Sequence, residues 1–317
     1  MTFAIEAEGL VKRFSKTLAV DGVDLAVRPG MVLGLLGPNG AGKTTVVRML
    51  ATLLQPEAGY ARVCGADVVR QPERVRELIG LTGQYAAVDE DLTGFENLLL
   101  IGRLLEIPRA EAKRRSGELL ERFDLADAGG RSVKTYSGGM RRRLDLAASL
   151  VQRPQVLFLD EPTTGLDPRS RGEVWAMIRT LVAEGTTVLL TTQYLDEADR
   201  LASEIAVIDH GRVIATGTAA ELKAKVGRQT LDVRPADPAD LDLVAGIVTT
   251  AVGRAPARTE EDPGLLSVPV DDAQALPAVV SALQDEQVEV IELALRLASL
   301  DEVFMALTGH AAAEDTP

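Results

Sequence analysis

Hydrophobic and polar residues alternate from Ile5 to Val27, with turn signals at Gly9 and at Asp21-Gly22. Such alternation predicts short antiparallel strands that bury one face. The pattern changes at Met31, where a continuous apolar run extends to Leu36 and ends in a glycine-rich loop. After Thr45, apolar residues recur with the spacing of a helix. The order predicted here is therefore strand, loop and helix.

The middle of the chain predicts a helical insert followed by a parallel sheet. Residues 94–124 have helical periodicity with a break at Pro108, and we expect the insert to span about Gly94 to Arg153. Short apolar runs then alternate with helical stretches, which is typical of strands in a parallel sheet. These runs are Val156 to Asp160, Thr187 to Thr192 and Ile205 to Asp209.

Beyond Val226 the pattern restarts and predicts a small α+β domain of ferredoxin-like type. We expect two domains, 1–225 and 226–317, the first of α/β class with its small antiparallel region and helical insert. The expected elements of the second are a strand at Gln229 to Val233, a helix at Asp240 to Val252, a hairpin about Asp262-Pro263-Gly264, a helix at Ala273 to Leu283, a strand at Val288 to Leu293 and a helix at Leu300 to Leu307.

Charge and length support this division. A chain of 317 residues is comfortable for two domains. Residues 226–317 contain 5 of the 34 basic and 17 of the 47 acidic residues, a net charge of −12, whereas residues 1–225 contain 29 basic and 30 acidic residues. An acidic domain is a poor candidate for direct contact with nucleic acid or anionic lipid. The simpler interpretation of its charge is a solvated surface that favours solubility.

A single cysteine, Cys64, excludes a disulfide within the chain and provides no zinc-binding spacing. This favours a reducing compartment, with the cytoplasm as the default. The longest apolar stretches fall short of the roughly 18 residues that a membrane-spanning helix needs, and the N-terminus lacks the features of a signal peptide. We expect any membrane contact to occur through a partner.

The glycine-rich loop satisfies the phosphate-loop pattern, in which backbone N–H groups and the end of the following helix bind phosphate oxygens. Lys43 is expected to contact the β and γ phosphates of ATP, and the Thr44 hydroxyl to bind Mg²⁺. The alternative interpretation is a glycine-rich turn without ligand. The expected nucleotide-binding residues are Gly37, Pro38, Asn39, Gly40, Ala41, Gly42, Lys43, Thr44 and Thr45.

Two adjacent carboxylates, Asp160 and Glu161, follow the apolar residues 156–159 and precede Pro162. Residues next to each other at the end of a strand point to opposite sides. We therefore expect Asp160 to hold Mg²⁺ and Glu161 to act as the catalytic base that polarises the attacking water. A surface acidic pair is the alternative interpretation.

These motifs, with Tyr136-Ser137-Gly138-Gly139-Met140 about twenty residues before the acidic pair, resemble the ABC ATPase family over about the first 220 residues. The resemblance implies that Ser137, Gly138 and Gly139 bind the γ-phosphate of ATP held by a second copy of the chain. It also implies that Asp167, in Gly165-Leu166-Asp167, couples the two sites of that dimer. Tyr136 and Met140 depart from the leucine and glutamine that are commonest in the family.

The same resemblance assigns roles to three further residues. Gln84 matches the family's glutamine loop, which meets both Mg²⁺ and the membrane partner, although a single glutamine can also be an ordinary loop residue. Phe14 resembles the aromatic residue that stacks on adenine, but it could equally belong to the core. Gln193 occupies the place of a histidine that senses the γ-phosphate. Both histidines, His210 and His310, lie elsewhere, so the site lacks a titrating residue at this place.

Gln193, together with Leu300 to Gly309, resembles the ATP-binding subunits of daunorubicin/doxorubicin-resistance-type exporters. Residues 300–309 are also compatible with an amphipathic helix that packs on its own domain. The resemblance implies a Mg²⁺-dependent ATPase that dimerises around two ATP molecules and drives a separate membrane permease, at the cytoplasmic face of the membrane. It implies no contact with nucleic acid.

Three alternatives differ from this function. A soluble ABC ATPase that acts on nucleic acid or ribosomes usually has tandem ATPase domains, coiled coils or basic stretches, which this chain lacks. A regulator without catalysis is disfavoured because Glu161 is present. An importer subunit remains open, since the direction of transport rests on the resemblance alone.

Overall fold

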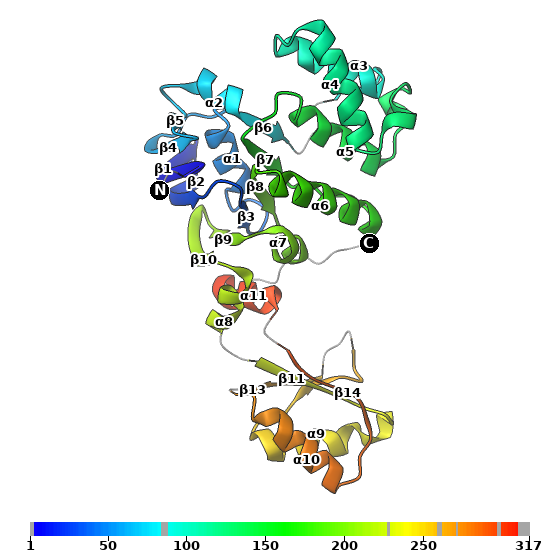
Figure 1. Cartoon of the computed structure of the whole chain (residues 1–317). Coiled ribbons are helices and arrows are strands. Elements are labelled where there is room, and N and C mark those ends of the chain that lie inside the picture. Colours follow the sequence, from blue (N-terminus) through cyan, green and yellow to red (C-terminus); the bar gives the residue numbers. More distant parts are fainter. Residues whose placement is uncertain are drawn as a thin grey trace. The chain divides into compact units, whose positions relative to one another are not determined.

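The computed structural model describes residues 3–83, 88–226, 229–258, 262–270, 272–296 and 299–309. The chain divides into two units, one that extends to Ala219 and one formed by Ala220–Ala311. Figure 1 shows the elements of each unit. None of the helices in the described part of the chain is both long enough and apolar enough to cross a membrane.

The first unit begins with a four-stranded antiparallel sheet in the order β2-β1-β4-β5. Strands β1 and β4 approach each other so closely at Gly59 that only glycine fits there. A Cβ atom at Gly59 would lie 2.2 Å from the carbonyl oxygen of Gly9. The alternation predicted for residues 5–27 corresponds to the first two strands. The strands are β1 (Ile5–Phe14), β2 (Thr17–Val27), β4 (Ala58–Val63) and β5 (Ala66–Asp67).

A six-stranded sheet in the order β10-β9-β3-β8-β7-β6 forms the centre of this unit. Its strands pair in parallel, except for β10, which pairs antiparallel with β9. The carboxyl ends of parallel strands meet at one edge, so the loops after them lie close together. The strands are β3 (Val32–Leu36), β6 (Ile79–Thr82), β7 (Val156–Asp160), β8 (Thr187–Thr192), β9 (Glu204–Asp209) and β10 (Arg212–Gly217).

The central strands β3, β7 and β8 are buried on both faces, which explains why they are continuous apolar runs. Along β7, Val156 and Phe158 join the core shared with the antiparallel sheet, whereas Leu157 and Leu159 join the core formed with the insert and α6. Figure 1 shows α3, α4 and α5 grouped as the insert. The helices are α1 (Lys43–Leu50), α2 (Pro72–Leu78), α3 (Gly94–Leu104), α4 (Arg109–Arg122), α5 (Gly138–Ser149), α6 (Pro168–Ala183) and α7 (Leu195–Leu201).

Local chemistry positions the insert. Thr93 and Glu96 form a capping box at the start of α3, and the predicted break at Pro108 is the residue that precedes α4. The buried hydroxyl of Tyr136 donates to the carbonyl oxygen of Ala128 at 2.7 Å. A Cβ atom at Gly94 would lie 2.4 Å from that hydroxyl, so glycine makes room for it. Tyr136, a departure from the family pattern, therefore has a structural role inside the insert.

The second unit contains a four-stranded antiparallel sheet in the order β12-β13-β11-β14, and α9 and α10 supply residues to its core. The succession β-α-β-β-α-β is the ferredoxin-like arrangement expected from the sequence. A further helix, α11, has a capping box formed by Ser299 and Glu302. The elements are α8 (Ala219–Val226), β11 (Gln229–Pro235), α9 (Leu241–Val252), β12 (Ala257–Arg258), β13 (Leu266–Val270), α10 (Ala275–Asp285), β14 (Val290–Arg296) and α11 (Leu300–Thr308).

Candidate functional site

The phosphate loop lies between β3 and α1 and is closely surrounded by backbone. A Cβ atom at Gly37 would lie 2.2 Å from the carbonyl oxygen of Ile208, and one at Gly42 would lie 2.4 Å from that of Ala19. Gly42 also has a φ of 108°, in the left-handed region that favours glycine. Only glycine fits these two positions, so the loop can present backbone N–H groups without side chains in the way.

Lys43 is folded back into this loop and is 4% exposed. Its Nζ donates to the carbonyl oxygens of Gly37 at 2.8 Å and Pro38 at 3.1 Å, and it lies 3.8 Å from Oε1 of Glu161. Burial lowers the pKa of Lys43, and the nearby charges of Glu161 and Asp160 oppose this effect. A phosphate group beside Lys43 would favour its charged form.

Oxygen ligands suited to Mg²⁺ meet beside Lys43. The hydroxyl of Thr44 donates to Oδ1 of Asp160 at 2.9 Å, and the hydroxyl of Thr191 donates to the same oxygen at 2.6 Å. Hydroxyl and carboxylate oxygens fit this ion, which commonly completes its coordination with phosphate oxygens and water. The described residues contain no group of three or more His, Cys, Asp or Glu side chains that could hold a metal ion.

The direction of the Glu161 side chain has a different cause from the one expected. Strand β7 ends at Asp160, and Glu161 has a φ of 51°, so a left-handed turn and not strand alternation sets its direction. This conformation costs about 1–3 kcal/mol in a residue other than glycine. The N–H of Glu161 donates to the carbonyl oxygen of Thr191 at 3.1 Å and to its hydroxyl at 3.0 Å. Strand alternation is therefore not the physical reason for the placement of the Glu161 side chain, because Glu161 lies outside the strand.

Ser137 and Asp167 each cap a helix of their own chain. The Ser137 hydroxyl accepts from the N–H of Met140 at 3.2 Å at the start of α5. The Asp167 carboxylate accepts from the N–H and hydroxyl of Ser170, at 3.0 and 2.6 Å, at the start of α6. These bonds lower the pKa of Asp167. A Cβ atom at Gly139 would lie 2.6 Å from Oγ of Ser170, so glycine lets the two helix starts approach each other.

A cavity of about 310 Å³ adjoins the start of α5. Gly138 and Arg141 line it from α5, and Glu161, Thr164 and Leu166 line it from the segment after β7. Gly138 and Glu161, two of the predicted site residues, therefore line the same cavity within one chain.

Gln193 follows β8 and lies beside the phosphate loop. The N–H of Gly37 donates to the carbonyl oxygen of Thr192 at 3.3 Å, which ties the end of β8 to the first residue of that loop. Oε1 of Gln193 is buried and has no hydrogen-bond partner within the described part of the chain. Buried polar atoms are nearly always paired, so this side chain has an interaction left to make.

Two predicted contacts lie at the margins of the site. Phe14, at the end of β1, is 45% exposed, which excludes the core interpretation of this residue. Lys12 lies over its ring, with Nζ 5.8 Å from the ring centre. Gln84 and His310 lie outside the described residues.

Sequence reasoning missed two buried residues of this site. Arg142 of α5 donates to the carbonyl oxygens of Glu161 at 2.8 Å and Pro162 at 2.5 Å. Its only signal in the sequence is the run of three arginines directly after Ser137 to Met140. Glu197 accepts from the hydroxyl of Thr163 at 2.8 Å and from Nε1 of Trp175 at 3.0 Å, and burial raises its pKa. No signal in the sequence distinguishes Glu197 from a surface acid of α7.

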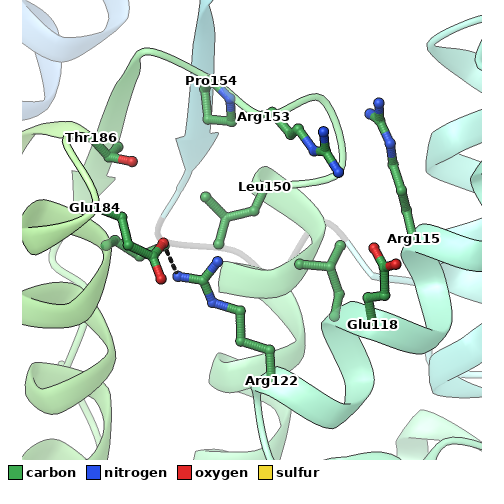
Figure 2. A pocket seen from close by; sticks show the side chains of 10 residues that line it. Arg115, Glu118, Arg122, Leu150, Arg153, Pro154, Glu184 and Thr186 are labelled. Carbon is green, nitrogen blue, oxygen red and sulfur yellow. Dashed lines mark hydrogen bonds and ion pairs between the residues drawn. The ribbon is translucent and has the colours of Figure 1, made fainter.

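Another cavity, of about 360 Å³, shares no residue with the phosphate loop, with the carboxylates Asp160 and Glu161 or with Gln193. Figure 2 shows it where α4, the end of α5 and the end of α6 meet. Arg122 donates to Glu184 at 2.5 Å, and Arg115 donates to the carbonyl oxygen of Val151 at 2.7 Å. Because these two arginines are already paired within the chain, we assign no ligand to this cavity.

Comparison with known proteins identifies the family. The family described as "ABC transporter" matches residues 20–164, and "ATP-binding protein DrrA1-3-like, C-terminal domain" matches residues 217–308. The daunorubicin resistance ATP-binding protein DrrA2 of Streptomyces coeruleorubidus is 56% identical over 308 residues, which cover 97% of this chain and 96% of that protein. The chain belongs to the ABC transporter family. Its first unit is thus an ATPase domain that binds ATP.

Two further relatives of this ABC transporter ATPase support the same conclusion. The daunorubicin/doxorubicin resistance ATP-binding protein DrrA of Streptomyces peucetius is 55% identical over 98% of this chain and 94% of its own length. The structure of cbiO1 from Clostridium perfringens, part of the ABC transporter complex cbiONQ, is 26% identical, with a TM-score of 0.66 over 71% of this chain and 92% of that chain. The predicted fold class and ATPase activity are confirmed. ABC ATP-binding subunits of exporters dimerise and function with membrane permeases.

Proposed function

We propose that this chain is the ATPase subunit of an exporter for daunorubicin-like or other hydrophobic compounds, and that it powers a separate membrane permease. The observation that carries the proposal is the meeting of Lys43 with Glu161, and of Thr44 with Asp160, around the phosphate loop. Similar proteins are named as daunorubicin or doxorubicin resistance proteins, and the C-terminal domain of this chain matches the DrrA1-3-like family. These similarities support a drug of this kind as the transported compound.

In this proposal the loop from Gly37 to Thr45 binds the phosphates of ATP, with Lys43 at the β and γ phosphates. Thr44 and Asp160 would hold Mg²⁺, with Gln84 as a further contact, and the bound ion would supply positive charge against the developing negative charge of the phosphates. Glu161 accepts a proton from the attacking water. The exposed ring of Phe14 stacks on adenine.

The proposed assembly is a homodimer with two ATP molecules between its subunits. Ser137, Gly138 and Gly139 reach the γ-phosphate held by the other copy, because the start of α5 presents backbone donors to an anion. Asp167, at the start of the adjacent helix, couples the two sites. We place the dimer at the cytoplasmic face of the membrane, attached through the permease, with the acidic unit as an accessory domain.

Transport by inverted membrane vesicles tests this function. The chain would be co-expressed with a candidate membrane permease, and daunorubicin fluorescence would be followed after addition of ATP. An exporter concentrates the drug inside such vesicles, and the Glu161→Gln variant supplies the inactive control. Drug accumulation that is identical without ATP, or in that variant, would contradict the proposal, and ATP-driven loss of preloaded drug would indicate an importer.

Gln193→Ala is expected to lower turnover at saturating ATP by roughly threefold to tenfold. The missing amide removes one hydrogen bond to the γ-phosphate, and a bond of this kind contributes about 0.5–1.5 kcal/mol. Steady-state kinetics would measure kcat. The matched control is Gln284→Ala, which changes an exposed glutamine of α10. An unchanged kcat would refute a γ-phosphate contact by Gln193.

A further inference from the structure

Arg142 lies inside the ATPase unit between two functional segments. We call α5 the signature helix, because it begins directly after Ser137, and we call Asp160–Pro162 the catalytic turn. The Arg142 side chain is 13% exposed. Its guanidinium donates to three successive carbonyl oxygens of the catalytic turn, at 3.3, 2.8 and 2.5 Å for Asp160, Glu161 and Pro162. It therefore touches every residue of that turn.

The same guanidinium also reaches the segment that leads to Gln84. It donates to the carbonyl oxygen of Gly83 at 3.0 Å and contacts Oδ2 of Asp145 at 3.4 Å. Asp145 belongs to the signature helix, so this carboxylate orients the arginine from within its own element. One side chain thus joins the signature helix, the catalytic turn and the residue that precedes Gln84.

The catalytic turn needs such support because its backbone is strained. The left-handed φ of Glu161 persists only when surrounding groups enforce it. Thr191 holds the N–H of Glu161, and Arg142 holds its carbonyl oxygen. The planar guanidinium offers five donors in a fixed geometry and can serve several acceptors at once, which a lysine ammonium group cannot do with the same geometry.

We propose that Arg142 is a positioning residue for ATP hydrolysis. It holds the catalytic turn of its own subunit so that the Glu161 carboxylate faces Lys43, and it ties this orientation to the signature helix. The inference rests on the proposed function, since it requires Glu161 to be the base. It adds a residue that acts through Glu161 and does not itself touch the reacting atoms.

Steady-state kinetics of Arg142→Lys and Arg142→Met provide the first test. We expect kcat to fall by about 100-fold, the loss that a misplacement of about 1 Å can cause, while the KM for ATP stays within about twofold. Arg143→Lys is the matched control, because Arg143 is also 13% exposed on the same helix but contacts Asp124 and the carbonyl oxygen of Phe123. Its kcat should remain at the wild-type value.

Two readouts separate positioning from general support of the fold. Hydrogen exchange of the nucleotide-free protein should accelerate in a peptide covering residues 159–167 of Arg142→Lys, with residues 79–82 and 187–192 unchanged. On a Glu161→Gln background, Arg142→Lys should reduce single-turnover rates by no more than about twofold further, since two residues that act as a unit have non-additive effects.

An unchanged kcat in both Arg142 variants, losses that multiply in the double variant, or loss of ATP binding together with kcat would each overturn the positioning role. Failure of the proposed function has a separate signature, in which Glu161→Gln itself turns over at the wild-type rate.

Discussion

Glu161→Gln is expected to lower ATP turnover by about 10² to 10⁴-fold and to leave ATP binding intact. Glutamine has nearly the same shape as glutamate, but its neutral amide cannot accept a proton from the attacking water. The carboxylate lies 3.8 Å from Lys43, where it would face the phosphates of bound ATP, so its neutralisation would remove a repulsion between two anions. The variant should therefore bind ATP at least as well as the wild type and persist as an ATP-bound dimer. Phosphate release measures the turnover, and size-exclusion chromatography with ATP measures the dimer.

A surface glutamate gives the matched control for this change. Glu173→Gln, on α6, alters a residue paired with Arg169 away from the phosphate loop and should retain wild-type turnover. Wild-type turnover in purified Glu161→Gln would remove Glu161 as the base. A low turnover without ATP binding would instead assign this carboxylate to the binding of nucleotide.

Mixing Lys43→Ala with Ser137→Asp is expected to restore activity that neither variant has alone. If Ser137 acts on the ATP of the other subunit, a mixed dimer has one intact site, formed by Lys43 of one chain and Ser137 of the other. Random mixing of equal amounts makes half of the dimers mixed, so turnover should reach about a quarter of the wild-type value. Aspartate is chosen because it caps a helix as well as serine does, while its charge repels phosphate.

The cap on α5 makes this choice necessary. Ser137→Ala would lose the bond from the N–H of Met140, which costs about 1 kcal/mol, together with any phosphate contact. Thermal melting of Ser137→Asp close to the wild-type value would show that the cap remains. Mixtures with no activity above the separate variants would argue against a site shared between subunits. Full wild-type activity would also contradict it, because a mixed dimer can have only one intact site.

Local residue types made the phosphate loop predictable. Gly37 to Thr44 combines glycines, a lysine and a hydroxyl between an apolar run and a helical pattern, and each of these features is visible in a short stretch of sequence. The ferredoxin-like order of the second unit was predictable for the same reason, since each strand and helix has its own periodicity.

The turn at Glu161 was not predictable in this way. Strand alternation gives the direction of a side chain only while the strand continues, and β7 stops one residue earlier. Arg142 posed a similar problem, because Arg141, Arg142 and Arg143 are equivalent in the sequence. Only the tertiary structure distinguishes the middle arginine, which donates to the carbonyl oxygens of Glu161 and Pro162 after β7. Phe14 could be assigned to the surface only from its place at the end of β1.

The sequence by itself determined the order of elements, the chemical groups of the candidate site and the resemblance to ABC ATPases, because these depend on neighbouring residues and on backbone periodicity. The tertiary structure decided which distant groups meet. Thr44 contacts Asp160 across 116 positions of the chain, and Lys43 faces Glu161, because β3, β8 and β7 pair in that order and register. Strand order and register depend on long-range packing, which a local pattern of residues does not contain.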